Sequence, residues 1–173
     1  SIIKEIQKSS SFFRNLSSGY LLAVDSSVDI QCSEYSMQRI FAVARDTGAG
    51  LVYPDFLKAN ANGRAAHPLT DYQPGSIRDD FNFGHFFILS AEAIRTAIKK
   101  YGAPGSDPDT ALYDLRLKIS LGSVIFHLPE FLYTASIKKQ KKKKNGKSET
   151  HFNYVAKENF IRQKKFEKIA TEH

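Results

Sequence analysis

Two kinds of hydrophobic pattern alternate along the chain. Short continuous apolar runs, typical of buried strands, occupy residues 20–24, 49–53, 86–90 and 124–128. Segments in which apolar residues recur every three or four positions, which predict amphipathic helices, lie at 1–16, 33–48, 90–102, 109–120 and 157–171. Residues 58–76 are rich in Asn, Gly and Pro and predict a long polar loop.

The ends of two predicted helices carry recognisable signals. Ser33 and Ser90 stand where a side-chain oxygen can cap a helix, and Gly48 and Gly102 stand where a glycine can end one. Because strands and helices alternate, we expect an α/β fold with a mixed, mostly parallel sheet flanked by helices. Ligands of such sheets bind beyond the carboxyl ends of the strands, which is where we expect the site.

Composition and charge exclude several classes of protein. The chain has 173 residues and one cysteine, which rules out an internal disulfide framework. Its net charge of +7 comes from residues 138–147, whose seven lysines account for the whole excess. Such a block is usually a solvated loop, and nucleic-acid binding would rest on it alone, so we expect no nucleic acid as a partner. No apolar run approaches the roughly 18 residues that suggest a transmembrane segment.

Aspartates close two of the predicted strands. Asp25 comes directly after YLLAV, and Asp55 ends LVYPD. A carboxylate in this position can hold a divalent cation that bridges phosphates, usually Mg²⁺ or Mn²⁺. Aspartate is also a common turn and capping residue, and for either residue alone this structural role is the favoured interpretation. If both residues serve a ligand, their carboxylates should face one cleft.

The densest group of polar and aromatic residues is DYQPGSIRDDFNFG, residues 71–84. Arg78 can neutralise only one of the adjacent acids Asp79 and Asp80. The two phenylalanines of the segment stand two positions apart, so they share one face if the backbone is extended. Either the segment is a ligand site, or one acid caps a turn while the phenylalanines belong to the core. The sequence leaves both interpretations open.

Residues in other segments are weaker candidates. His127 lies inside an apolar run and is expected to be a core or supporting histidine rather than a base. Glu130 follows it closely and can line a cleft. Cys32 has no histidine or acid at a recognisable spacing, which disfavours a nucleophilic role.

Motifs spread over nearly the whole chain together resemble one family. They are VYPD at 52–55, the segment 71–84, LYDLRL at 112–117, HLPEFLYT at 127–134, residues 152–163, and TEH at 171–173. On these motifs the chain resembles the family 2 glycosyltransferases of the GT-A fold. It is most similar to the amino-terminal region of long bacterial family 2 proteins, and residues 71–84 are the most specific part of the match.

The resemblance implies a reaction and places its residues. Such enzymes transfer a sugar from a sugar nucleotide and hold the diphosphate with a divalent cation, Mn or Mg. Their metal-binding Asp-x-Asp corresponds here to Asp25 followed by two serines, so Asp25 is the one metal ligand implied. The acidic pair that supplies the base falls near residues 111–112, where Asp114 is the acid that remains close by. These departures favour a module that has lost catalysis.

The site residues expected from the motifs fall into two groups. The catalytic candidates are Asp79, Asp80 and Asp114. The residues expected to contact substrate are Asp25, Asp55, Tyr72, Arg78 and Glu130. In this scheme a carboxylate takes the proton of the acceptor hydroxyl, Arg78 orients that carboxylate, and Tyr72 stacks on a sugar face.

The resemblance also implies how the chain is organised. Residues 1–137 form a GT-A-like α/β core equivalent to the second half of that fold. Residues 138–150 form a lysine-rich exposed loop. Residues 151–173 form a helix that packs on the core or leads to a following domain. We expect the chain to be a piece of a longer protein.

Two functions remain as expectations. In the first, the parent is a bacterial, cytoplasmic glycosyltransferase of polysaccharide biosynthesis, at the inner face of the membrane. This region then forms part of the cleft for the sugar nucleotide and the glycan acceptor, and is inactive by itself. In the second, it is a degenerate GT-A-like module that binds carbohydrate or assembles with an active glycosyltransferase domain that follows in the same chain. The sequence leaves the sugar, the acceptor, the stereochemistry and dimerisation open.

Overall fold

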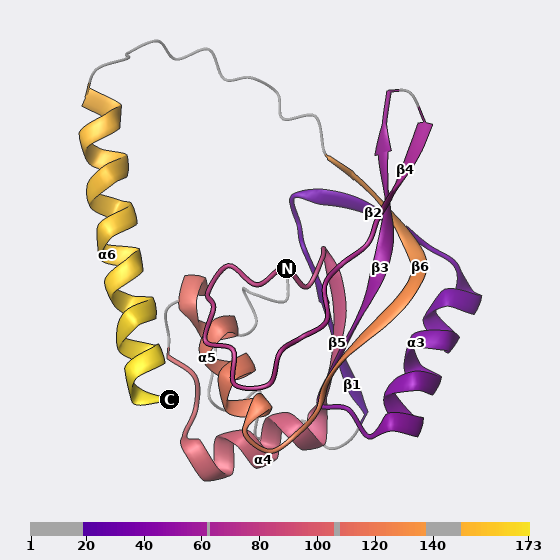
Figure 1. The fold of residues 1–173 in the computed structure, drawn as a ribbon, viewed down its shortest axis with the longest axis horizontal. Coiled ribbons are helices and arrows are strands. Elements are labelled where there is room, and N and C mark those ends of the chain that lie inside the picture. The colour runs from indigo at the N-terminus through magenta and orange to yellow at the C-terminus, as the bar shows by residue number, and fades with distance from the viewer. Residues whose placement is uncertain (1–18, 62, 106–107, 138–149) are drawn as a thin grey trace.

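The computed structural model describes residues 19–61, 63–105, 108–137 and 150–173. Its elements are β1 (Tyr20–Val24), β2 (Val28–Cys32), α3 (Glu34–Thr47), β3 (Leu51–Asn60), β4 (Gly63–His67), β5 (Phe86–Ser90), α4 (Ala91–Tyr101), α5 (Pro108–Ser120), β6 (Ile125–Ile137) and α6 (Thr150–Glu172) (Figure 1). The helix predicted for residues 1–16 and the lysine tract at 138–147 lie outside the described residues.

The capping signals act as predicted. The Ser33 hydroxyl accepts a hydrogen bond from the Ser36 N–H at 3.1 Å and begins α3, which ends at Gly48 in the left-handed conformation. The Ser90 hydroxyl accepts from the Ala93 N–H at 3.4 Å and begins α4, which ends before Gly102. These caps fix where the two helices start relative to the strands beside them.

The sheet has the order β1-β5-β3-β6-β2, with β4 paired to β3. The expected α/β class is confirmed, but the expected mostly parallel pairing is wrong. Among the described strands, only β3 and β6 run parallel, whereas β1 with β5, β5 with β3, β3 with β4 and β6 with β2 are antiparallel. The alternation of strands and helices misled the prediction, because β2 and β4, which were not among the predicted strands, each pair antiparallel with a longer strand.

Residues 58–76 are only partly the loop that was predicted. β3 continues to Asn60, and β4 returns beside it with Asn60 opposite Gly63, so the two strands form a projecting hairpin (Figure 1). Almost every residue of β4 is exposed. The paired residues beyond Phe56 are half-buried or exposed and mostly small or polar, so their composition resembles that of a loop.

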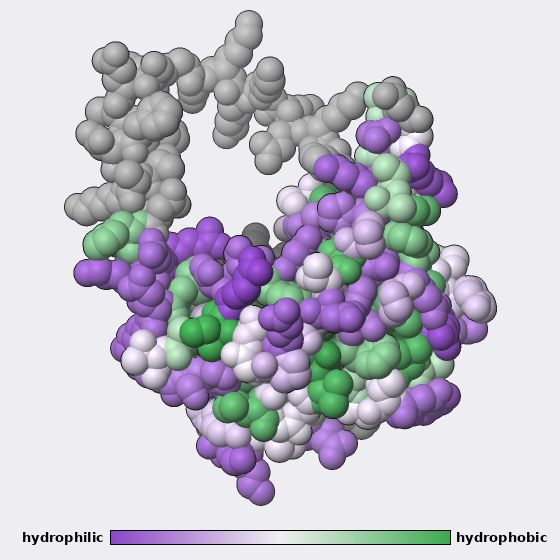
Figure 2. Space-filling model, in the orientation of Figure 1, coloured by the Kyte–Doolittle hydropathy of each residue, from purple (hydrophilic) through white to green (hydrophobic). Residues whose placement is uncertain are grey.

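Helices cover the two faces of the sheet. Figure 1 shows α3 on one side and α4, α5 and α6 on the other. The fully buried side chains come mainly from β3, β5 and the helices, and the largest include Tyr53, Ile40, Leu51, Ile88, Ile94 and Leu115. A smaller cluster joins α6 to α5, where the Phe166 and Tyr113 ring centroids are 5.0 Å apart. On the face drawn in Figure 2, hydrophilic side chains predominate and apolar ones form small separate groups.

The parallel pair β3–β6 contains an irregularity that shapes the site. The register shifts between Pro54 and Asp55 and again between Asp55 and Phe56, so that Pro54 lies opposite Leu128 while Asp55 lies opposite Phe131. Bulges of this kind redirect side chains and are common beside functional sites. Here the bulge falls at a buried aspartate in the middle of the sheet.

Candidate functional site

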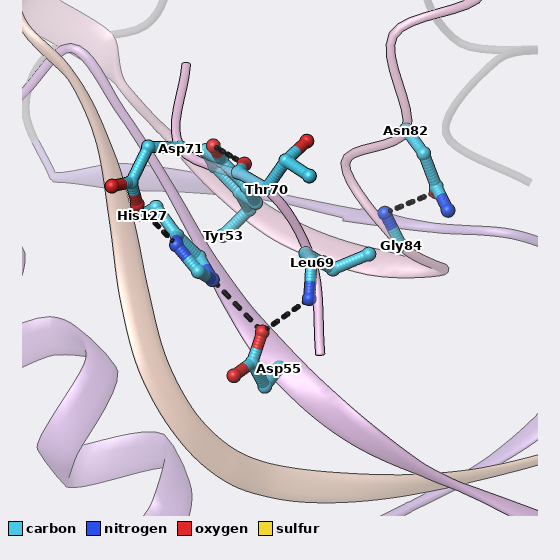
Figure 3. Close-up of polar contacts among 8 residues, drawn as sticks. All are labelled: Tyr53, Asp55, Leu69, Thr70, Asp71, Asn82, Gly84 and His127. Carbon is cyan, nitrogen blue, oxygen red and sulfur yellow. Dashed lines mark hydrogen bonds and ion pairs between the residues drawn. The ribbon is translucent and has the colours of Figure 1, made fainter. Parts of the chain in front are cut away.

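A buried chain of hydrogen bonds lies at the bulge. Asp55 is 3% exposed, and its Oδ1 accepts from the Leu69 N–H at 2.7 Å and lies 2.8 Å from Nε2 of His127. On the other side of the same ring, Nδ1 lies 2.6 Å from Oδ1 of Asp71. Figure 3 shows His127 between the two carboxylates, one from β3 and one from the segment that follows Leu69. The chain therefore ties residues 69–71 to the centre of the sheet.

The hydrogen-bonded series Asp55–His127–Asp71 connects two carboxylates through one imidazole ring. Each ring nitrogen of His127 lies within hydrogen-bond distance of one of the two carboxylates. Asp55 is buried, whereas the Asp71 side chain is 90% exposed, so the chain runs from the core to solvent. His127 is thus a supporting residue between two acids, consistent with the role expected of it. Its partner Asp71 is a residue that the sequence analysis did not single out.

Tyr53 also holds this segment in place. Its ring stacks on His127 with centroids 5.0 Å apart and planes 19° apart, and its hydroxyl donates to the Thr70 carbonyl at 2.7 Å (Figure 3). Burial raises the pKa of Tyr53, with the nearby Asp71 charge adding to the effect, so the hydroxyl stays a donor. The VYPD and HLPEFLYT motifs therefore meet at one place and hold residues 69–71.

The rest of the segment 71–84 is held by α5. Arg116 is buried, and its Nη2 donates to the Arg78 carbonyl at 2.6 Å while its Nη1 donates to the Ser76 carbonyl at 3.4 Å. The Tyr113 hydroxyl donates to the Ile77 carbonyl at 2.5 Å. Burial lowers the pKa of Arg116, and hydrogen bonds to carbonyl oxygens and contacts with the Tyr72 and Tyr113 rings offset part of that desolvation. The LYDLRL motif thus positions residues 76–78 through their backbone.

The aromatic residues of the segment belong to the core. The Phe81 and Phe83 centroids are 4.6 Å apart, and both rings pack edge-on against Tyr53 at 6.0 and 5.0 Å. Tyr72 packs on Phe81 at 5.3 Å, and its hydroxyl donates to the Ser76 carbonyl at 3.2 Å. The structure places Tyr72, expected to stack on a sugar, as part of the segment's own packing.

The two adjacent acids have different surroundings. Arg78 pairs with Asp80, with Nε 3.0 Å from Oδ1 and Nη2 3.1 Å from Oδ2. The hydrogen bond from Arg78 lowers the pKa of Asp80. Asp79 makes no hydrogen bond with any residue that the structure describes, although it lies within electrostatic reach of Arg116 and Tyr113. Asp79 is therefore the carboxylate of the pair that is available to a ligand.

Both acids line a cavity of about 610 Å³ between the segment and α6. The other residues that line it are Ile77, Tyr113, Arg162, Gln163, Phe166, Glu167 and Ala170. Its wall thus combines carboxylates, a guanidinium, an amide and two aromatic rings. Asp55 and Asp114 do not line it, so this cavity does not bring these two acids together with Asp79 and Asp80.

Asp25 lies apart from this cavity, at the end of β1. Its Oδ1 accepts from the Ser27 N–H at 2.8 Å, and its Oδ2 lies 3.0 Å from Nδ1 of His85. Burial would raise the pKa of Asp25, but the hydrogen bonds from Ser27 and His85 hold it below its usual value. Both carboxylate oxygens are thus engaged, and no group of three His, Cys, Asp or Glu side chains able to hold a metal occurs among the described residues. The structure therefore gives the Asp25 carboxylate two partners within the fold.

The remaining two candidates form ion pairs elsewhere. Asp114 pairs with Lys118 one helical turn away at 2.9 Å and accepts from the Gly105 N–H at 3.1 Å. Glu130 pairs with Arg39 of α3 at 2.6 Å, and the hydrogen bonds from Arg39 lower its pKa. The structure therefore gives each of these carboxylates a partner within the fold.

Three residues that matter to the site were not singled out from the sequence, and they are Asp71, His85 and Arg116. Arg116 carried a usable signal, because an arginine amid the leucines of LYDLRLKIS occupies a helix face that should be buried. His85 carried none, since its partner Asp25 is 60 positions away in the sequence.

Comparison with the models of known protein families finds no match for this chain, and comparison with curated protein sequences finds none either. Among the described helices, none has both the length and the apolar composition needed to span a membrane.

Proposed function

We propose that this chain is part of a family 2 glycosyltransferase-like protein and that the cavity lined by Asp79 contributes to its binding of sugar or glycan acceptor. One observation carries the proposal. Residues from three of the motifs that underlie the family resemblance, far apart in the sequence, line the same cavity. They are Asp79 and Asp80 from segment 71–84, Tyr113 from LYDLRL, and Gln163 from the motif at 152–163.

The chemistry of the cavity wall supports a carbohydrate ligand. Sugar hydroxyls donate and accept hydrogen bonds, and the wall offers carboxylates as acceptors, the Arg162 guanidinium as a donor and the Gln163 amide as both. The rings of Tyr113 and Phe166, which pack against each other, form the apolar part of the wall. Cavities of about this size hold small ligands in many proteins.

Within this proposal Asp79 has the role of acceptor-side carboxylate. In an inverting transfer, the acceptor O–H proton passes to the carboxylate as the acceptor oxygen bonds to the anomeric carbon. The bond from that carbon to the diphosphate breaks, and the diphosphate leaves with the electron pair. Asp79 suits this role better than Asp80 because Arg78 already neutralises Asp80.

A second candidate function is a GT-A-like module that binds carbohydrate without catalysis. The engagement of Asp25 with Ser27 and His85 favours it, because the carboxylate that would help to hold the diphosphate is used inside the fold. The fold itself is compatible with part of a GT-A sheet only in its mixed α/β layers, since the parallel pairing in the part of the chain that the structure describes is between β3 and β6. Both candidates share carbohydrate binding, and they differ in turnover.

The experiment measures binding and turnover separately. The chain is titrated with uridine- and guanosine-diphosphate sugars and with neutral oligosaccharides, and the same mixtures are assayed for release of nucleoside diphosphate. We expect an oligosaccharide to bind and Asp79→Asn to weaken it about tenfold, the effect of losing roughly 1.4 kcal/mol. The matched control is Asp46→Asn, an exposed aspartate on α3.

Turnover that Asp79→Asn abolishes would favour the enzyme. Binding without turnover fits both forms of the proposal, because the first expects this region to be inactive by itself. Both forms of the proposal fail if no sugar binds to the natural chain, or if Asp79→Asn and Asp46→Asn bind it equally well.

A further inference from the structure

The last helix, α6, has two sides of different character. Its inward side packs on α5 through Phe166, the one buried side chain among those described in α6, and it also lines the Asp79 cavity. Figure 1 shows the helix beside α5, at the margin of the molecule. Lys164 and Lys168 each stand two positions from Phe166, which turns them roughly 200° away from it around the helix. These lysines therefore mark the outward side of α6.

The outward side carries two large apolar side chains. Phe160 is 57% exposed and Ile161 is 47% exposed, and both stand three or four positions from Lys164, on the same side of the helix. Single apolar residues on a surface are common and need no explanation. Here two of them adjoin on the side that faces away from α5. Such a pair loses its contact with water only when another surface covers it.

Lysines flank this apolar pair. The Lys164 ammonium lies 4.7 Å from the Phe160 ring centroid, and the Lys168 side chain, 77% exposed, follows one turn later. Lys165 is also exposed. Glu172 pairs with Lys168 at 3.7 Å, but both side chains are exposed, and ion pairs of this kind contribute little. The outward side of α6 is therefore both basic and partly apolar.

We propose that the outward side of α6, formed by Phe160, Ile161, Lys164 and Lys168, docks on an anionic membrane surface. Charge complementarity attracts the lysines to acidic lipid headgroups, while the two apolar side chains enter the boundary between the headgroups and the acyl chains. Lysine stems are long enough for the ammonium groups to reach the lipid phosphates from there. Because the apolar area is small, the docking is reversible.

The apolar pair decides between a bilayer and other polyanions. A nucleic acid attracts the lysines equally well, but it offers Ile161 no acyl chains, so a bilayer fits this surface better. The four residues of the surface do not line the Asp79 cavity, which meets the opposite side of the helix. The inference therefore stands or fails independently of the proposed function.

A single tryptophan reports whether the surface enters lipid. The chain contains no tryptophan, so Phe160→Trp introduces the only one. The variant is mixed with phosphatidylcholine vesicles that contain about one third phosphatidylglycerol, and with vesicles of phosphatidylcholine alone. We expect its emission maximum to move to shorter wavelength with the anionic vesicles and to stay unchanged with the neutral ones. Phe131→Trp, at a phenylalanine of β6 that is 45% exposed, is the matched control and should shift with neither.

The control separates docking by α6 from attraction by other charges. The lysines at 138–147 are the same in both variants, so vesicle binding through them alone would leave the two tryptophans with the same response. Equal spectral changes in the two variants, or no change at position 160, would overturn the proposal. A shift of the Phe160→Trp emission with an oligothymidylate but not with vesicles would assign the surface to nucleic acid instead and would also overturn it.

Charge variants test the electrostatic part on different residues. Lys164→Gln together with Lys168→Gln should weaken cosedimentation with the anionic vesicles about 25-fold, since each lysine close to such a surface contributes about fivefold. Lys99→Gln together with Lys100→Gln removes the same charge from α4 and should weaken it less than about twofold. If the two double variants bind the vesicles equally, the proposal is wrong. Because the tryptophan and glutamine variants change different residues, one that fails to fold leaves the other test decisive.

Discussion

Two carboxylate-rich regions of this molecule are joined through one segment but use their charge in opposite ways. Asp55 is buried and bonded to His127 and to the Leu69 backbone. Asp79 and Asp80 are exposed to solvent. Arg78 pairs with Asp80, whereas Asp79 makes no hydrogen bond with a described residue. A buried carboxylate keeps its partners because the alternative is costly, whereas an exposed one can exchange water for a ligand. Burial therefore distinguishes the carboxylate that holds the segment in place, Asp55, from the one that is available to a ligand, Asp79.

The largest loss of stability is expected from His127→Leu. The change leaves Asp55 buried without its main partner, which should lower the free energy of unfolding by about 3 kcal/mol. Urea denaturation measures this loss. His67→Leu on the exposed hairpin is the control and should cost under about 1 kcal/mol. If the two variants have the same free energy of unfolding, the hydrogen bonds of His127 add no more stability than the contacts of His67 on the hairpin.

Arg116→Met should have the next largest effect. It removes the hydrogen bonds to the carbonyls of Ser76 and Arg78, and losses of this kind cost about 2 kcal/mol. Hydrogen exchange should also speed up across residues 76–80, because their backbone loses its anchor. Arg45→Met, on the exposed face of α3, should change neither quantity. Unaltered exchange in the segment would mean that α5 does not position it.

Tyr53→Phe should produce a smaller loss, confined to one hydrogen bond. The ring stays stacked on His127 while the bond to the Thr70 carbonyl disappears, at a cost of about 1 kcal/mol. The midpoint of urea unfolding reports the change. A loss as large as that of His127→Leu would contradict the view that His127, and not Tyr53, is the centre of the buried chain.

The smallest effect is a pH dependence from Asp25. Its pKa is lower in the folded chain than in the unfolded one, so it adds stability above the unfolded value, about 3.9, and that contribution is lost as the pH falls through the folded value. Asp25→Asn should therefore lose less stability than the natural chain between about pH 6 and about pH 3. Identical pH profiles for the two proteins would show that the bonds to His85 and Ser27 carry no net energy.

The sequence predicted the elements with strong local signals and missed those defined by distant partners. The helices after Ser33 and Ser90 were located by their caps, and the strand at residues 86–90 by its apolar run. The hairpin of β3 and β4 was predicted as a loop because its outer residues are half-buried or exposed and mostly small or polar. The parallel sheet was wrong because strand order and direction depend on tertiary packing rather than on the alternation of elements.

The site shows the same division. The adjacent acids at 79 and 80 could be recognised as candidates from the sequence, and so could Asp25 and Asp55. Their residue type and their positions relative to neighbouring residues were enough to identify them. Their roles could not be separated from sequence, since Asp55 meets His127 across 72 positions and Asp25 meets His85 across 60. Which acid Arg78 neutralises also depended on the backbone that Arg116 holds.

The most direct test of the contrast between the two regions is a map of amide chemical shifts during titration with a panel of neutral disaccharides. If Asp79 lies in the binding cavity and Asp55 in the scaffold, the amides of Ile77, Asp79, Asp80 and Gln163 should move, and those of Asp55 and His127 should stay in place. Shifts centred on Asp55 and His127, or no shift with any disaccharide of the panel, would contradict the assignment of binding to the exposed acids.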